Sequence, residues 1–209
     1  TRKSNKGRAS YGASKAQNNT GGTITLTGTT GNSAGMYATG GGTVENTGNI
    51  TGSGLTDTTG ISVDTGSTGT SSGDINLSGS IIAGAYNQGT GKFYMTGGTI
   101  TVVGTGAGVF AKNNTSTTEI DGKVEASGGA VGLYVADTAK IDLGKNGTPS
   151  LEIGSNGLMF YNNTTGSSAN DGTFKLHKNI SGTVNNGGKA FLLSGVNTMG
   201  EIASALNAM

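Results

Sequence analysis

The chain has 209 residues, of which 41 are glycine, one is proline and none is cysteine, and its formal net charge is +1. Charged residues make up only 12% of the sequence, which argues against an electrostatic nucleic-acid binder, because such a protein needs a clustered basic face. The sequence has no cysteine pair, GxxxxGKS/T loop or HExxH motif to support a zinc or phosphate site, and no stretch has the length of a transmembrane helix.

The N-terminal stretch 1–20 carries five basic side chains, no acidic ones and almost no large apolar ones. We expect residues 1–20 to form a frayed end or a partial coil, with a functional basic arm as the alternative. Because the sequence has neither an initiator methionine nor a signal peptide, we also expect the chain to be a piece of a longer protein.

Residues 21–195 contain a motif that returns at a nearly constant interval of about 24 residues. Each copy is centred on a glycine, and these glycines are Gly35, Gly60, Gly84, Gly108, Gly132 and Gly157. A fixed period of this length is typical of a structural repeat that stacks on itself.

Alternation within the motif predicts which side chains are buried. The residues just before, just after and three after each glycine are mostly apolar, as in Ala107, Val109 and Ala111, and we expect them to point inward. The other phase, which includes the glycines themselves, is expected to point outward. It contains the column Tyr37, Ser62, Tyr86, Phe110, Tyr134 and Met159, with Phe191 as a further member.

Two more short runs of alternating apolar and polar residues lie between successive motifs, as at residues 92–95 and 99–102. With the glycine-centred strand they make three strands per period, and no sustained helical periodicity separates them. The pattern predicts an all-β fold, a parallel β-helix of three sides and roughly seven coils. By analogy with known three-sided solenoids, we expect it to be right-handed.

The period breaks after the sixth motif. Residues 164–171 form an extra polar run, which predicts a projecting loop that is either ordinary length variation or a ligand contact. Residues 196–209 follow the last coil, and the capping-box spacing of Thr198 and Glu201 predicts a short closing helix or a truncated coil there.

Acidic residues are spread thinly over the coils. Asp121 and Lys145 lie at the same offset past two successive motif glycines, which predicts an ion pair between coils, and Glu119 and Asp142 are expected to lie near each other. At an exposed sheet surface such groups are usually solvated charges. His177, the single histidine, has no motif partner. We therefore predict no catalytic residues, no metal site and no cofactor.

The aromatic column is the strongest candidate for a binding surface. Tyr37, Tyr86, Phe110 and Tyr134 would present rings on a rigid sheet, where they can stack on sugars or anchor a protein partner. Two alternatives are an aromatic ladder that only stiffens the stack and a column that lies inside.

Several segments resemble passenger regions of type V secreted autotransporters, and more narrowly the very large fusobacterial outer-membrane adhesins. They are AGMYA from Ala34, AGVFA from Ala107, VGLYV from Val131, NTGNITG from Asn46 and IDLGKNG from Ile141. The similarity covers about residues 21–195. It implies a β-helical stalk or adhesin on the surface of a Gram-negative bacterium, held in the outer membrane by a C-terminal β-barrel outside this chain. It transfers no catalytic residues.

Our leading hypothesis is a non-enzymatic adhesin segment whose rod contacts host glycans, host protein receptors or other bacteria. One alternative is a spacer that holds a distant binding domain away from the membrane. Another is a polysaccharide-degrading β-helix enzyme that would depend on acids such as Asp121 and Asp142.

Overall fold

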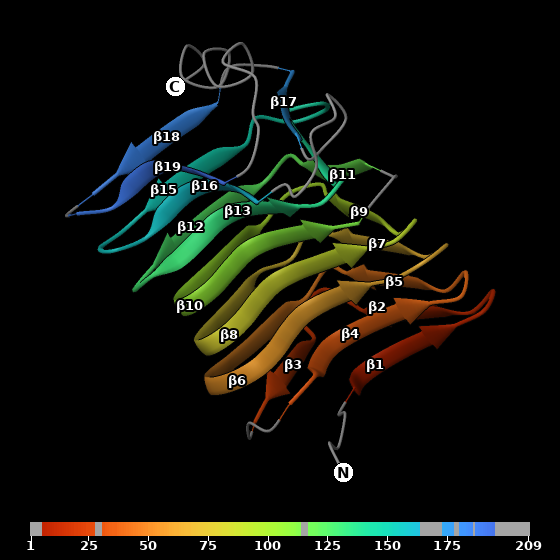
Figure 1. Ribbon diagram of the computed structural model, residues 1–209. Coiled ribbons are helices and arrows are strands. Elements are labelled where there is room, and N and C mark those ends of the chain that lie inside the picture. Colours follow the sequence, from red (N-terminus) through yellow and green to blue (C-terminus); the bar gives the residue numbers. More distant parts are fainter. Residues whose placement is uncertain are drawn as a thin grey trace.

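The computed structural model describes residues 6–27, 31–113, 117–163, 173–177, 180–185 and 187–194. These residues form parallel strands stacked into a three-sided β-solenoid, which confirms the predicted parallel β-helix. In Figure 1 the near strands run from left to right while the chain climbs from the red to the blue end, so the coil is right-handed. Within the described ranges no segment is a helix long and apolar enough to cross a membrane.

One side of the solenoid, which we call the glycine face, carries the repeated motif. It consists of β1 (Lys6–Tyr11), β4 (Ser33–Thr39), the second halves of β6 (Asn49–Val63), β8 (Ile75–Gln88) and β10 (Thr99–Lys112), then β13 (Ala130–Ala136), β16 (Leu158–Asn163) and β19 (Lys189–Ser194). This face is turned toward the viewer in Figure 1.

The second side is a separate seven-stranded sheet with one strand from each turn. Its members are β2 (Lys15–Asn18), β5 (Thr43–Asn46), β7 (Thr68–Ser71), β9 (Lys92–Met95), β11 (Thr117–Ile120), β14 (Lys140–Leu143) and β17 (Thr173–Leu176). These strands mark six complete turns and part of another within the described ranges, close to the number that the sequence period predicts.

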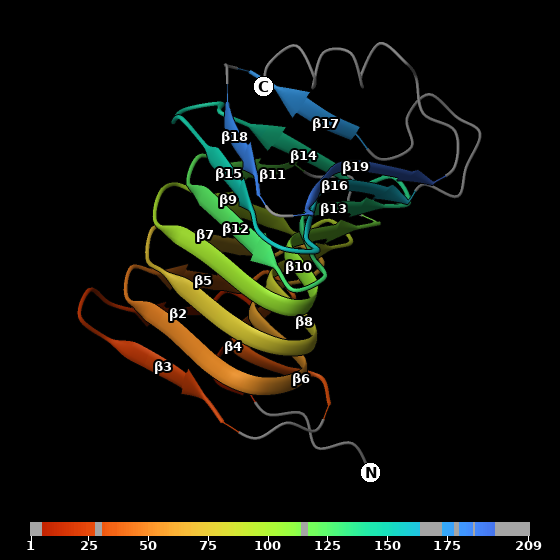
Figure 2. The same ribbon diagram turned by 90° about the vertical axis from the view of Figure 1, so that its left-hand side faces the viewer.

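The third side joins the glycine face around a corner, as Figure 2 shows. It consists of β3 (Thr23–Leu26), the first halves of β6, β8 and β10, then β12 (Lys123–Ser127), β15 (Ser150–Ile153) and β18 (Ser181–Val184). Gly79 and Gly104, both at positive φ, pair with each other where β8 and β10 turn this corner, and the register shifts just after them, between Gly104 and Gly106. A positive φ suits glycine because it lacks a Cβ atom.

Identical or similar apolar side chains stack from turn to turn in the core. One such row, on the third face, is Ile24, Ile50, Ile75, Ile100, Val124 and Leu151. All six are buried, and strands of successive turns lie about 4.8 Å apart, so each side chain covers the next. A single turn would leave these side chains exposed, and stacking on the neighbouring turns buries them.

The structure corrects the predicted orientation of the motif glycines, which point inward rather than outward. A Cβ atom built on Gly84 would lie 2.2 Å from Ile100 Cγ2, inside the core. Ala85, the next residue, is also buried, so two successive residues face inward. The residue before the glycine, such as Ala83 or Ala107, is buried as predicted, with 8% and 2% exposed, but it lines a surface groove and is not part of the core cluster.

The sixth motif is also displaced from its predicted alignment. Leu133 pairs with Phe160 and Tyr134 with Tyr161, so this turn is longer than those before it. Met159 is buried and is not in the aromatic column, whose place Tyr161 takes. Phe191 pairs with Phe160 and therefore belongs to the row of Leu133, not to the column of Tyr134.

The predictions for the N-terminal stretch, the polar loop and the closing helix have different outcomes. Residues 6–11 and 15–18 form β1 and β2, which pair with β4 and β5 of the next turn. The predicted loop at 164–171 and the predicted closing helix at 198–209 lie outside the described residues.

Candidate ligand-binding groove

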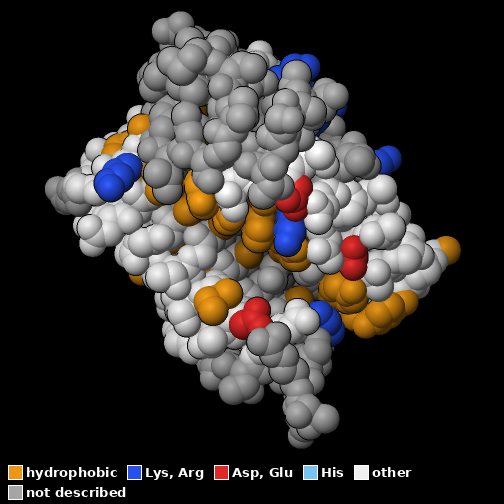
Figure 3. Space-filling model, in the orientation of Figure 1, with side chains coloured by type: hydrophobic (Ala, Val, Ile, Leu, Met, Phe, Trp, Pro, Cys, Tyr) orange, Lys and Arg blue, Asp and Glu red, His pale blue; other side chains and the backbone are white. Residues whose placement is uncertain are grey.

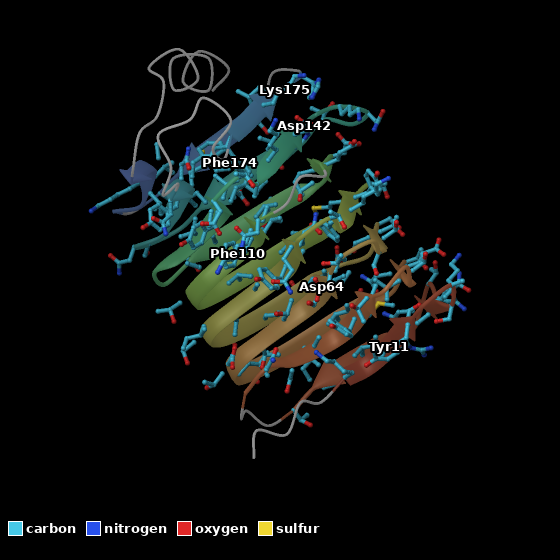
Figure 4. All side chains as sticks on the ribbon, turned by 45° about the vertical axis from the view of Figure 1, so that its right-hand side comes forward. Tyr11, Asp64, Phe110, Asp142, Phe174 and Lys175 are labelled. Carbon is cyan, nitrogen blue, oxygen red and sulfur yellow. The ribbon has the colours of Figure 1, made fainter. Side chains whose placement is uncertain are left out.

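Four aromatic side chains form a continuous ladder on the glycine face. The ring centroids of Tyr86 and Phe110 are 5.1 Å apart, those of Phe110 and Tyr134 4.3 Å, and those of Tyr134 and Tyr161 4.7 Å. Phe110 and Tyr134 are nearly parallel, with an interplanar angle of 12°. Figure 4 labels Phe110, about halfway along the rod. The rings are half-buried and lie on the outer surface.

Tyr37 lies apart from this ladder, although the sequence placed it in the same column. Ser62 occupies the intervening position and is only 8% exposed, so no open slot separates Tyr37 from Tyr86. Tyr37 instead contacts Tyr11 edge-on at 5.9 Å, and Lys6 Nζ lies 4.0 Å from its ring centroid. Three of the four predicted binding residues are therefore brought together, and Tyr161 joins them.

A groove of about 520 Å³ runs beside the ladder and parallel to the rod axis. Its floor contains the small residues Ala83 and Ala107, and one wall consists of the four rings of the ladder. The other wall is the corner with the third face, where Ile81 and Asp57 lie. Figure 3 shows this hollow with hydrophobic side chains along it.

The corner beside the groove holds an unusual residue. Asn32, Asp57 and Ile81 occupy one row in successive turns, and all three have positive φ, of 51°, 51° and 54°. Asn and Asp tolerate this left-handed conformation, whereas a β-branched residue rarely adopts it. Ile81 is nevertheless 69% exposed at the groove. Neither backbone preference nor burial on folding accounts for an isoleucine here.

We expect Ile81→Asn to stabilise the fold by about 1 kcal/mol, because a left-handed backbone costs most L-residues about 1–2 kcal/mol and asparagine less. The backbone N–H of Ile81, which donates to Thr105 Oγ1 at 3.2 Å, is retained in the variant. Thermal unfolding would measure the change. Ile82→Asn is the contrasting variant: Ile82 is only 2% exposed, and its replacement should destabilise the protein.

The phenol groups of Tyr86 and Tyr134 are already hydrogen-bonded within the protein. Tyr86 Oη donates to Gln88 Oε1 at 2.7 Å, and Asn163 Nδ2 donates to Tyr134 Oη at 3.0 Å. Burial raises the pKa of Tyr86, and the negative charges of Asp64 and Asp137 raise it further. The phenol therefore stays neutral at physiological pH, and the ladder presents mainly ring carbon to the groove.

The acidic residues on the seven-stranded sheet are engaged in pairs. Glu119 and Asp142 are neighbours in register, as predicted, but the predicted partner of Lys145 is wrong. Lys145 Nζ lies 2.5 Å from Glu119 Oε1, and this contact raises the pKa of Lys145. Asp121 instead accepts hydrogen bonds from the backbone N–H of Asn146.

Asp142 has a second neighbour on the following turn. His177 Nε2 lies 3.3 Å from Asp142 Oδ1, and Lys175 is paired with Asp142 in the register of β14 and β17. Figure 4 labels Asp142 and Lys175 at this end of the rod. Among the described residues, no group of three or more His, Cys, Asp or Glu side chains is arranged to hold a metal ion.

A charge cluster on the third face is centred on Lys123. Its ammonium contacts Glu125 Oε1 at 2.5 Å and also Glu152, and the hydrogen bonds to these carboxylates raise the pKa of Lys123 to about 12. The contact with Lys123 is the main cause that lowers the pKa of Glu125, which also accepts from Thr101 Oγ1 at 2.9 Å.

We expect this cluster to make a small, pH-dependent contribution to stability. The lowered pKa of Glu125 gives stability that is present above its ordinary pKa of 4.5 and is lost as pH falls through the lowered value. The raised pKa of Lys123 gives stability that is present below 10.5 and is lost as pH rises through about 12. Since the side chains are about one-third exposed, Glu125→Gln should cost under about 1 kcal/mol near neutral pH. Melting curves of both proteins would test this, and the difference should shrink in acid and in high salt.

Comparison of the chain with known protein families, characterised proteins and solved structures gives no match. The geometry above is therefore the basis for any functional conclusion. Two of its elements, Tyr161 and Ile81, were not among the residues predicted from sequence. The Tyr at 161 could have been found by aligning ring with ring instead of glycine with glycine.

Proposed function

We propose that this chain is a segment of a surface-exposed adhesin, an autotransporter passenger, that contacts its target through the aromatic groove on the glycine face. The observation that carries the proposal is the groove of about 520 Å³ walled by Tyr86, Phe110, Tyr134 and Tyr161. Tyrosine-rich, partly exposed surfaces on rigid scaffolds are common anchors for partners. The resemblance of its repeats to fusobacterial adhesins supports the same reading.

The proposed role is non-enzymatic. Glu119 pairs with Lys145, Asp142 lies beside His177, and Asp121 accepts from a backbone amide. Because these carboxylates are engaged in ion pairs and backbone hydrogen bonds, we do not assign them as the general acid and base of glycoside hydrolysis. Turnover of a polysaccharide panel that depends on Asp121 or Asp142 would contradict this part of the proposal.

The test is binding of the purified protein to host cells and to a glycan array, with a Tyr86→Ala/Tyr134→Ala variant whose fold is verified by circular dichroism. We expect the variant to lose binding by about tenfold or more, because hot-spot aromatic residues dominate interface energy. Tyr94→Ala is the matched control, since Tyr94 is a half-buried tyrosine on β9 in the seven-stranded sheet and does not line the groove. Wild-type binding by the folded double variant would refute the groove as the adhesive site.

A spacer is the second candidate, and the ladder itself favours it. Rings stacked at 4.3–5.1 Å along the rod axis add cohesion between turns without any ligand. If neither the wild-type protein nor the variant binds cells, the spacer function replaces adhesion.

A further inference from the structure

The faces of the ladder rings are covered by one another. Phe110 lies between Tyr86 and Tyr134, and Tyr134 lies between Phe110 and Tyr161, at centroid distances of 4.3–5.1 Å. Sugars bind aromatic residues through an open ring face. Along this stretch the groove meets ring edges instead, so the ladder is poorly arranged for stacking a glycan.

Besides the ladder hydroxyls, the groove lining holds three polar side chains, those of Asn32, Asp57 and Thr59, and its other members are apolar residues and glycines. Sugar hydroxyls require many hydrogen-bond partners, because each polar group buried without one is costly. The hydroxyls of Tyr86 and Tyr134 already bond Gln88 and Asn163. The floor at Ala83 and Ala107 offers methyl groups. These surroundings favour aliphatic side chains as occupants.

Charge at the groove is localised at one corner. Among the described residues that line the groove, Asp57 is the one that carries a charge, and its Oδ2 also accepts a hydrogen bond from the backbone N–H of Asn32 at 2.9 Å. It lies beside Ile81 in the same row of turns, so a carboxylate and an exposed apolar side chain are adjacent at this wall. The same face also carries Lys6, Arg8, Lys112 and Lys189, which do not line the groove.

We propose that the groove binds a protein partner, through an extended segment that places aliphatic side chains along the floor and a basic residue against Asp57, with Ile81 as the specificity-determining contact. This inference rests on the proposed adhesive function and narrows its target from glycan or protein to protein. The complementarity is apolar along the ladder and electrostatic at the corner. Ile81 keeps an unfavourable backbone there because its side chain contacts the partner.

The experiment uses the whole chain and three probes in fluorescence anisotropy: labelled peptide amides KLGLSG and ELGLSG, and labelled chitotetraose. We expect KLGLSG to bind about threefold more tightly than ELGLSG, since an exposed ion pair contributes modestly, and chitotetraose not to bind. Ile81→Asn should weaken both peptides by about tenfold, because it removes the apolar contact. Asp57→Asn should leave ELGLSG binding intact and abolish the preference for lysine.

Both substitutions introduce the residue already present at Asn32, in the same row and at the same positive φ, so they should fold normally. Binding of chitotetraose, or failure of both peptides to bind, would overturn the inference. Cell adhesion measured in parallel separates the two proposals. Adhesion without peptide binding refutes the protein-binding groove alone, whereas peptide binding without adhesion supports the groove and refutes the adhesin.

Discussion

Gly84→Ala is expected to destabilise the solenoid by about 3 kcal/mol or more, at the upper end of what overpacking a core costs. The added methyl would lie 2.2 Å from Ile100 Cγ2 and 2.6 Å from the carbonyl oxygen of Gly108. The side chain of Ile100 is buried in a continuous row, and the carbonyl is fixed in the next turn, so neither can move freely. Chemical denaturation would measure the loss.

Gly97→Ala is the matched control for this substitution. A Cβ atom at Gly97 would have its nearest neighbour, Ser72 Cβ, at 4.0 Å, and the backbone there is not left-handed. Its stability should stay within about 0.5 kcal/mol of the wild-type value. Equal stability of the two alanine variants would show that the motif glycines are not required by close packing.

Phe93→Ala should cost about 3–5 kcal/mol, the usual range for removing a buried phenylalanine. Phe93 is completely buried in β9 and pairs in register with Gly69 of the preceding turn. A Cβ atom at Gly69 would lie 2.4 Å from Val63 Cγ2 and 3.4 Å from Phe93 Cδ2, so both side chains fill space that the glycine leaves empty. Because neighbouring residues are held by interstrand pairing, the cavity should collapse only partly.

Phe93→Leu provides the comparison, with an expected loss of under about 1.5 kcal/mol because most of the volume is kept. Denaturant midpoints of the three proteins should therefore fall in the order wild type, leucine variant, alanine variant. An alanine variant as stable as the leucine variant would mean that the interior rearranges to fill the space.

The period and the alternation were sufficient to predict the fold. Three short strands per repeat, each with apolar residues at every second position, leave few architectures besides a three-sided parallel stack. The columns that depend on simple alternation were right, and Met36, Ile61, Val109 and Leu133 are all buried as expected. Regular parallel pairing keeps these positions aligned from one turn to the next.

The errors arise where the backbone departs from strict alternation or from constant length. Gly84 and Ala85 both face inward, and a strictly alternating pattern cannot predict two successive inward-facing residues. The turn that joins Ile120 to its partner Leu143 is shorter than the common period, which moves Lys145 away from the row of Asp121. The turn that joins Tyr134 to its partner Tyr161 is longer, which displaced the end of the aromatic column.

The groove combines a predictable and an unpredictable part. Tyr86, Phe110 and Tyr134 follow from the outward column, whereas Ile81 gives no sign in the sequence that its backbone is left-handed. Isoleucine is a strong strand former, so a sequence-based reading treats it as an ordinary strand residue. Its contribution becomes visible only when the corner is seen in three dimensions.

The hydrogen bonds between turns run along the rod axis, and this orientation determines how the molecule responds to tension. Force applied at the two ends loads the turns in series, so the outermost turn should peel away before the next is disturbed. Ala83 and Ala107 are paired in register on two successive turns. When one turn detaches, a segment as long as the chain between these two residues is released. Each event should therefore lengthen the chain by about 80 Å, and the rod would yield to flow in steps.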